Sequence, residues 1–160
     1  MTAIQWQESY SVGVPFIDAD HQILISLLNQ LFEAREEGQT REVIASVLNV
    51  LVEYTINHFH REERLMELGG YPDRAAHIEL HRTLTERVRG FQQQYADGRH
   101  AAVGELFEFL KDWLTGHIIA VDKRYKPYVE TVELTPSDLA GTFGDAESEG
   151  EDGTTIGAIA

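Results

Sequence analysis

Cysteine is absent from this chain of 160 residues. Disulfides, thiolate metal sites and cysteine nucleophiles are therefore excluded, and any metal site would have to use His, Asp and Glu. No apolar run approaches the ~18 residues of a membrane-spanning helix, and residues 1–16 carry neither the basic start nor the apolar stretch of a signal peptide. We therefore expect a cytoplasmic protein with no membrane partner.

Basic residues are also scarce. The chain has 13 Lys and Arg but 27 Asp and Glu, which gives a net charge of −14. Such an excess of negative charge disfavours nucleic acids and anionic membrane surfaces as partners. The hydrophobic share of 42% is ordinary for a globular protein. A chain of this length can bury a real core and is most simply one domain.

Proline and glycine are concentrated in a few places, and between them apolar residues recur at steps of three and four, which predicts four helices. We expect the first to be capped by Asp18 or Asp20, the second to run from Thr40 to about Glu67, the third to open at residues 71–73 and the fourth to finish before Pro127. Short polar loops between helices of this length predict an all-α fold, an antiparallel up-down-up-down four-helix bundle.

The two ends of the chain differ from this pattern. Residues 1–16 lack helical periodicity and are expected to form an extended arm on the bundle. From Thr131 onward the chain holds seven acidic residues, no Lys or Arg and several glycines, so half of the net charge lies there. This composition predicts a disordered acidic tail. The expected division is a bundle at residues 1–130 and a tail at 131–160.

Each predicted helix carries histidine on its inward, apolar face. The expected inward residues are His21, Leu24, Leu28, Leu31 and Phe32; Val43, Val47, Val50, Leu51, Tyr54, His58, Glu62 and Leu65; His77, Leu80, His81, Leu84, Val88, Phe91 and Tyr95; and Val103, Leu106, Leu110, Trp113, Leu114, His117 and Val121. His60 and His100 do not belong to these faces, and we expect them in solvent.

An inward imidazole and carboxylate one helical turn apart, such as His58 and Glu62, can either satisfy each other as a buried pair or bind a metal. Five imidazoles on four helices favour the metal, because each unsatisfied buried polar group costs about 1–3 kcal/mol. Nitrogen and oxygen ligands suit iron, zinc, manganese or copper. The number of ligands exceeds what one tetrahedral zinc needs, so two ions bridged by carboxylates fit better.

The spacing of these residues resembles a known family. The matching positions are Trp6, Val12-Gly13, Ile17-Asp18-x-x-His21, His58-Phe59-x-x-Glu62-Glu63-x-x-Met66, Gly70-Tyr71-Pro72, His77-x-x-x-His81 and Trp113-Leu114-x-x-His117-x-x-x-x-Asp122. In order and spacing this signature, over residues 6 to about 128, resembles the hemerythrins, specifically the single-domain bacterial ones.

The resemblance implies a non-haem centre of two iron ions with an oxo or hydroxo bridge. In the family pattern His77, His81 and His117 bind one iron, His21 and His58 bind the other, and Glu62 and Asp122 bridge them. The role of Asp122 rests on the resemblance alone, since five residues from His117 is a rotation of about 140° on an ideal helix. The resemblance also places Phe59, Trp113 and Leu114 around an O₂ pocket; from the sequence alone they would be plain core.

The function expected from the resemblance is reversible O₂ binding, for transport, storage, delivery or sensing, and not enzymatic turnover. The alternative is a di-iron enzyme that scavenges peroxide or nitric oxide, which would need an electron donor that the sequence does not show. A third interpretation is iron handling or a purely structural bundle.

The last seven residues, 154–160, have a different character, because they follow the acidic segment and are uncharged and mildly apolar. Thr155-Ile156-Gly157-Ala158-Ile159 resembles the C-terminal targeting peptides of encapsulin cargo proteins. If so, the peptide docks on an encapsulin shell and places the protein in a nanocompartment. The other interpretation is a frayed terminus.

Overall fold

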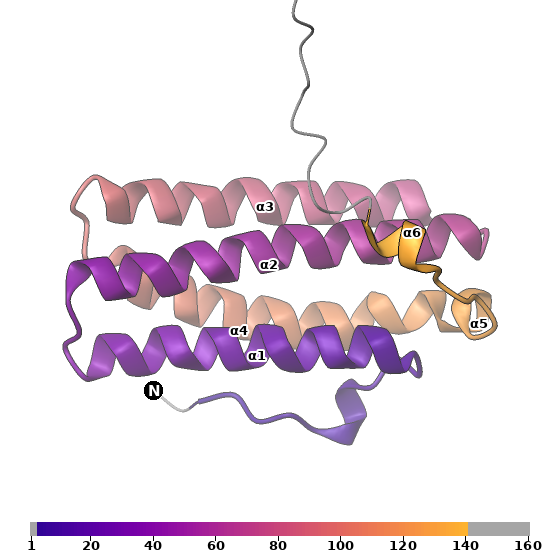
Figure 1. The fold of residues 1–160 in the computed structure, drawn as a ribbon, viewed down its shortest axis with the longest axis horizontal. Helices are drawn as coiled ribbons and strands as arrows, with labels where there is room; N and C mark the ends of the chain where they lie inside the picture. Colours follow the sequence, from indigo (N-terminus) through magenta and orange to yellow (C-terminus); the bar gives the residue numbers. More distant parts are fainter. Residues whose placement is uncertain (1–2, 141–160) are drawn as a thin grey trace, which may run out of the picture.

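The computed structural model describes residues 3–140, and residues 1–2 and 141–160 lie outside the described part. Four long helices dominate it: α1 (Pro15–Glu36), α2 (Arg41–Leu68), α3 (Arg74–Ala96) and α4 (Ala102–Ala120). They run antiparallel, and α1 packs on α2, α2 on α3, α3 on α4 and α4 on α1 (Figure 1). Within residues 3–140 there is no strand, so the predicted all-α up-down-up-down bundle is confirmed.

Short elements surround the bundle. The 3₁₀ helix η1 (Glu8–Tyr10) lies in the N-terminal arm, and η2 (Asp122–Tyr125) and α5 (Lys126–Val129) follow α4. The arm runs along α1 (Figure 1). The Asn29 side chain holds it there, because it accepts from the Ile4 N–H at 2.9 Å and donates to the Ile4 carbonyl at 2.7 Å.

The helix starts agree with the predictions only in part. Thr40 caps α2 as expected, and its side chain accepts from the Val43 N–H. The predicted caps of α1 are wrong, because that helix begins at Pro15, and proline fits a first helical turn. Asp18 instead accepts from the Val12 N–H at 2.8 Å and fixes the arm, whereas Asp20 is buried within the bundle.

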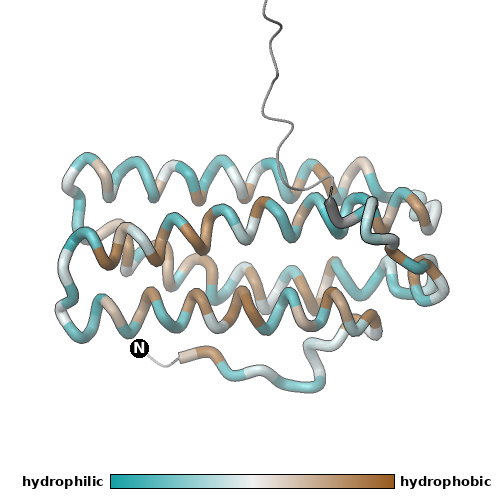
Figure 2. The backbone as a smooth tube through the Cα atoms, viewed as in Figure 1, coloured by the Kyte–Doolittle hydropathy of each residue, from teal (hydrophilic) through white to brown (hydrophobic). Residues whose placement is uncertain are grey.

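The core is a continuous cluster of apolar side chains contributed by all four long helices, and hydrophobic residues recur along each of them in Figure 2. Three residues that were predicted to face inward do not: Val43, Val50 and Leu80 are 42%, 52% and 45% exposed. On α2 the neighbouring Ile44 takes the inward position in place of Val43, whereas Leu51, which was also predicted to face inward, is buried as expected. Periodicity therefore located the helix but shifted part of its inward face by one position.

Past residue 130 the described chain still contacts the bundle. Helix α6 (Pro136–Ala140) carries Asp138, whose Oδ1 accepts from Arg64 Nε at 3.0 Å and Nη2 at 2.9 Å. This ion pair joins the first ten residues of the expected tail to α2. Figure 1 shows α6 beside α2. The candidate docking peptide at 154–160 lies outside the described residues.

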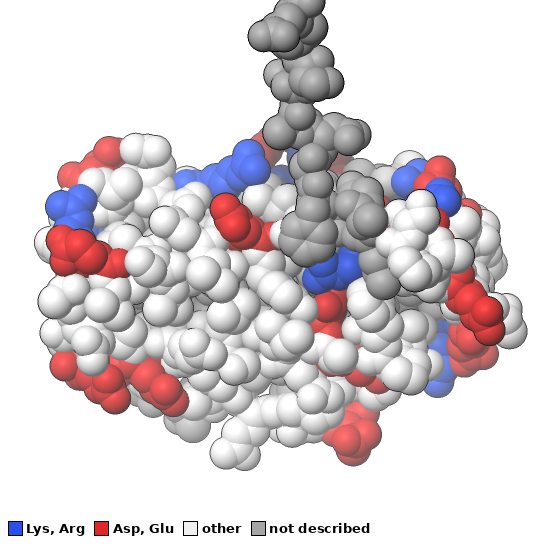
Figure 3. Space-filling view, in the orientation of Figure 1, with Lys and Arg blue, Asp and Glu red and all other residues white. Residues whose placement is uncertain are grey.

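Two observations on residues 3–140 concern nucleic acids and membranes, which the composition disfavours as partners. On the face drawn in Figure 3, acidic and basic side chains form small separate groups, and no continuous basic patch covers the coloured and white residues. Among residues 3–140, none of the helices combines the length and the hydropathy that a membrane crossing requires.

Candidate metal centre

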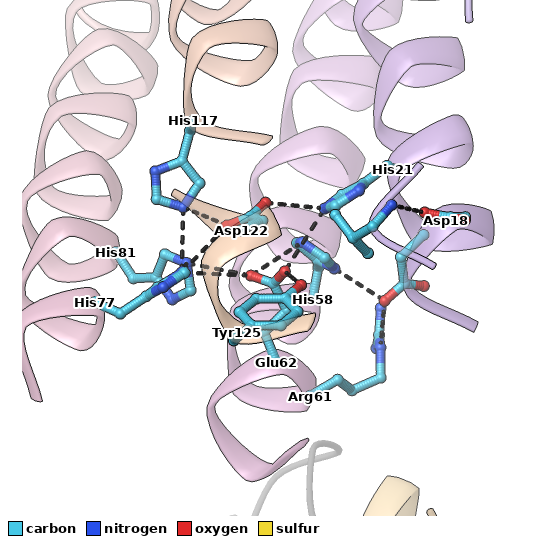
Figure 4. Close-up of polar contacts among 12 residues, drawn as sticks. Asp18, His21, His58, Arg61, Glu62, His77, His81, His117, Asp122 and Tyr125 are labelled. Carbon is cyan, nitrogen blue, oxygen red and sulfur yellow. Dashed lines mark hydrogen bonds and ion pairs between the residues drawn. The ribbon is translucent and has the colours of Figure 1, made fainter. Parts of the chain in front are cut away.

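The antiparallel arrangement brings the inward histidines to one end of the bundle. His21 lies near the start of α1 and His77 near the start of α3, whereas His58 and His117 lie near the ends of α2 and α4. In an antiparallel bundle these starts and ends meet at the same end. Figure 4 shows the side chains, together with His81, converging there.

Three of the imidazoles form one group with Asp122. His77 Nε2 lies 3.0 Å from His81 Nε2 and 3.3 Å from His117 Nε2. Asp122 Oδ1 lies 2.8 Å from His117 Nε2 and 3.3 Å from His77 Nε2. Two metal–imidazole bonds of about 2.1 Å at a right angle place their nitrogen atoms about 3 Å apart. The group therefore has the spacing of a ligand set around one ion.

His21, His58 and Glu62 form a second group. His58 Nε2 lies 3.5 Å from Glu62 Oε2, and His21 Nε2 lies 3.7 Å from Glu62 Oε1.

The two carboxylates lie between the groups. Asp122 Oδ2 is 3.4 Å from His21 Nε2, and Glu62 Oε2 is 3.3 Å from His81 Nε2. Each carboxylate thus contacts histidines of both groups, which is the position of a bridge between two ions.

Orphaned polar atoms test whether metal ions fit here. Both ring nitrogens of His21, Glu62 Oε2 and Asp122 Oδ1 are buried and make no well-aligned hydrogen bond, although charged neighbours lie 2.8–3.7 Å from three of these four atoms. Each such atom costs about 1–3 kcal/mol, and two adjacent buried carboxylates also repel each other. Two cations remove both penalties at once, so the imidazole and carboxylate donors fit a pair of metal ions.

Asp122 occupies its position because α4 stops before it. The helix ends at Ala120, Val121 adopts φ −117° and ψ −57°, and the chain continues as η2 from Asp122. The rotation of 140° expected on an ideal helix therefore does not apply. No spacing rule would have found this residue; only the family pattern indicated it.

A buried network behind His58 was missed by the sequence analysis. Asp20 accepts from His58 Nδ1 at 3.0 Å, from Arg61 Nε at 2.8 Å and from the Tyr54 hydroxyl at 2.7 Å. Burial raises the pKa of Asp20, but the hydrogen bonds from His58 and Arg61 outweigh it and bring the pKa to about 2. Asp20 is thus a permanent anion that fixes the ring of His58 and turns its Nε2 toward Glu62.

Two further side chains form hydrogen bonds with candidate metal ligands. Glu63 Oε1 accepts from His81 Nδ1 at 3.1 Å, so this acid contacts a candidate ligand. Tyr125, which is fully buried, donates its hydroxyl hydrogen to Glu62 Oε1. Burial and the neighbouring Glu62 raise the pKa of Tyr125 well above its ordinary value, so the phenol keeps the proton that it donates.

The three residues expected around the O₂ pocket line one small apolar cavity. Phe59, Trp113 and Leu114 surround it together with leucines of all four long helices, and its volume is about 20 Å³. Its polar lining residue, Thr55, is satisfied because its hydroxyl donates to the Leu51 carbonyl at 2.7 Å. Phe59 stacks on the ring of His81 with centroids 3.8 Å apart. The cavity therefore adjoins the imidazole cluster. His60 and His100 are exposed, as expected.

An antiparallel four-helix bundle that gathers five imidazoles and two carboxylates at one end defines a non-haem dinuclear metal protein. Residues 12–129 match the family described as Hemerythrin HHE cation binding domain. This chain belongs to the hemerythrin family, and the donor set and the family agree on a di-iron centre.

Individual relatives agree with this assignment. The chain is 35% identical over 130 residues to a bacteriohemerythrin of Stenotrophomonas maltophilia, covering 81% of this chain and 84% of the relative. It is 27% identical over 121 residues to a myohemerythrin of Riftia pachyptila, covering 76% and 89%. A crystal structure of wild-type hemerythrin superposes with a TM-score of 0.76 at 30% identity, over 81% of this chain and 99% of that one.

The iron-free protein is expected to lose stability as the pH rises above neutrality. Burial lowers the pKa of His21, but Asp122 and Glu62 outweigh it and raise the pKa to about 10; likewise Glu62 and Glu63 raise that of His81 to about 9. The stabilisation is complete below the unfolded value of about 6.5 and disappears through pH 9–10. Since each pKa unit corresponds to about 1.4 kcal/mol, we expect a loss of several kcal/mol.

Urea unfolding of the chelator-treated protein between pH 7 and pH 10 measures this loss. The iron-loaded protein is the control, because its imidazoles are bound as neutral ligands and should show a much smaller change. An iron-free protein of constant stability across this range would contradict the proposed contacts of His21 and His81 with the carboxylates.

Proposed function

We propose that this protein binds O₂ reversibly at a non-haem di-iron centre. The observation that carries the proposal is a buried set of five imidazoles and two carboxylates beside an apolar cavity. We assign His77, His81 and His117 to one iron, His21 and His58 to the other, and Glu62 and Asp122 to the bridge. The iron with two imidazoles has one protein ligand fewer, and we place O₂ on that side.

The iron pair, when bound, supplies the electrons that O₂ takes up and returns. The protein holds the ligands in place and keeps water and anions away from the site. Asp20 orients His58, Glu63 orients His81, and the Tyr125 hydroxyl holds one oxygen of Glu62. The apolar cavity admits a small neutral molecule and disfavours water and anions, because it offers them no hydrogen-bond partner.

A ligand set so rich in histidine favours binding over turnover, since it leaves little room for a substrate at the metals. Carboxylate-rich di-iron sites in other bundles carry more carboxylates and fewer imidazoles. We therefore propose a carrier, store or sensor of O₂, in preference to an enzyme that scavenges peroxide or nitric oxide. The test is repeated exposure of the reduced protein to air and then to vacuum. A carrier returns its O₂ intact, whereas a scavenger is oxidised or consumes its substrate over many turnovers.

Leu114→Ala is expected to keep both iron ions but to speed autoxidation of the oxygenated protein. Leu114 belongs to the cavity wall and is 8% exposed, so a smaller side chain opens the cavity to water. The decay of the oxygenated absorption band measures the rate, and Leu68→Ala, at an exposed leucine on α2, is the control. An autoxidation rate equal to that of the unchanged protein would mean that Leu114 only packs in the core and does not keep water from the site.

Two expectations remain predictions from the sequence. One is a location in the cytoplasm. The other is docking of residues 154–160 on an encapsulin shell, since that peptide lies outside the described residues.

A further inference from the structure

Three tyrosines form a continuous line from the centre to the surface. Tyr125 is fully buried and donates its hydroxyl hydrogen to Glu62 (Figure 4). The ring of Tyr71, 8% exposed, lies edge-on to that of Tyr125 with centroids 6.3 Å apart. Tyr128, 43% exposed, lies edge-on to Tyr71 with centroids 5.3 Å apart. Each ring is thus in contact range of the next, and exposure increases along the line.

The backbone fixes this line at the end of the bundle. Tyr125 and Tyr128 belong to the consecutive elements η2 and α5, and Tyr71 follows the end of α2, where its N–H donates to the Met66 carbonyl at 3.0 Å. At Gly69 an added Cβ would lie only 2.5 Å from the Tyr128 carbonyl oxygen. The close approach of α2 and α5 that this glycine permits holds Tyr71 against both partners.

Phenol side chains differ from the aliphatic core in their chemistry, because a phenol can give up one electron when its proton has an acceptor. The Tyr125 hydroxyl hydrogen lies in a hydrogen bond to Glu62 Oε1; it can shift along this bond while the ring is oxidised and return when Tyr71 reduces the ring. At the other end Tyr128 can release its proton to solvent. A phenylalanine could fill the same space, but it has no hydroxyl group and could not give up an electron and a proton in this way.

We propose that Tyr125, Tyr71 and Tyr128 form a relay that carries oxidising equivalents from the metal centre to the surface when hydrogen peroxide oxidises it. One peroxide molecule takes two electrons and two protons from two phenols, in separate one-electron steps. The O–O bond and two phenol O–H bonds break, two water molecules form and two phenoxyl radicals remain. At Tyr128 a radical takes one electron and one proton from a small phenol or thiol in solution, or it couples with the Tyr128 radical of another molecule through a carbon–carbon bond.

The relay rests on the di-iron centre of the proposed function but not on reversible O₂ binding. The experiment adds hydrogen peroxide to the iron-loaded full-length protein with a nitroso spin trap, and locates the adduct by peptide mass spectrometry. Without the trap, dityrosine fluorescence reports coupling. We expect the adduct at Tyr128. Tyr71→Phe should remove it, and Tyr128→Phe should abolish dityrosine and move the adduct to Tyr71.

Tyr10→Phe is the matched control, because Tyr10 is a half-buried tyrosine of the N-terminal arm outside the line; its adduct pattern should equal that of the unchanged protein. Iron-free protein should give no adduct. An adduct at Tyr128 that persists in Tyr71→Phe, or equal labelling of Tyr10 and Tyr128, would overturn the relay. Reversible O₂ uptake by Tyr71→Phe and Tyr128→Phe, followed by its absorption band, separates a failure of the relay from a failure of O₂ binding.

Discussion

Glu62→Ala is expected to lose both iron ions. Glu62 lies between the two groups of histidines, with one oxygen 3.3 Å from His81 and 3.5 Å from His58, and the other held by Tyr125. In the assignment that we propose, its removal takes a ligand from each ion and leaves Asp122 as the remaining bridging carboxylate. We expect the iron content to fall from two per chain to near zero, as measured by atomic emission on the purified variant.

Glu53→Ala is the control for this variant, since Glu53 is an exposed acid on the same helix. Circular dichroism should show that both variants keep their helix content, so that loss of iron is not loss of the fold. Full iron content in a folded Glu62→Ala protein would refute the bridging role that we assign to this residue.

Asp20→Ala is expected to lower the free energy of unfolding by about 3–5 kcal/mol, the usual cost of breaking a buried ion pair by removing one partner. Asp20 and Arg61 are 4% and 8% exposed, and the guanidinium would be left buried without its carboxylate. His58 would also lose the acceptor that orients its ring. Urea unfolding of the variant measures the loss of stability, and its iron content should fall as well.

Glu79→Ala is the matched comparison, because Glu79 pairs with Arg82 on the surface, where both side chains are more than half exposed. Removal of an exposed partner leaves the other charge in water, so we expect no measurable change in the urea midpoint. A loss of stability in Asp20→Ala no larger than in Glu79→Ala would mean that the buried network behind His58 is not structurally important.

Much of the bundle could be predicted from periodicity, because the helices are long and their buried residues recur at regular steps. His21, His58, His77, His81 and His117 could be found for the same reason, since each lies on the inward face of a regular helix. The exposed Val43, Val50 and Leu80 show the limit of this approach. A valine or leucine beside the true inward position looks the same to a periodicity argument, and only packing against the neighbouring helices distinguishes the two.

The remaining parts of the site depend on tertiary contacts that local sequence does not encode. Asp122 reaches the centre because α4 ends one residue before Val121. Asp20 is an acid near a helix start and was predicted as a cap, yet its partners lie on α2, about 40 positions away. Tyr125 meets Glu62 across 63 positions. Pairs so distant in the chain become visible only once the helices are packed.

The central claim, reversible O₂ binding at two iron ions, is tested most directly by one titration. The purified, reduced protein is exposed to measured amounts of O₂ while its iron content and visible spectrum are followed, and then returned to vacuum. We predict two iron ions per chain, uptake of one O₂ per iron pair, and disappearance of the oxygenated band under vacuum with recovery of the gas. Irreversible oxidation on the first exposure, or uptake without two iron ions per chain, would contradict it.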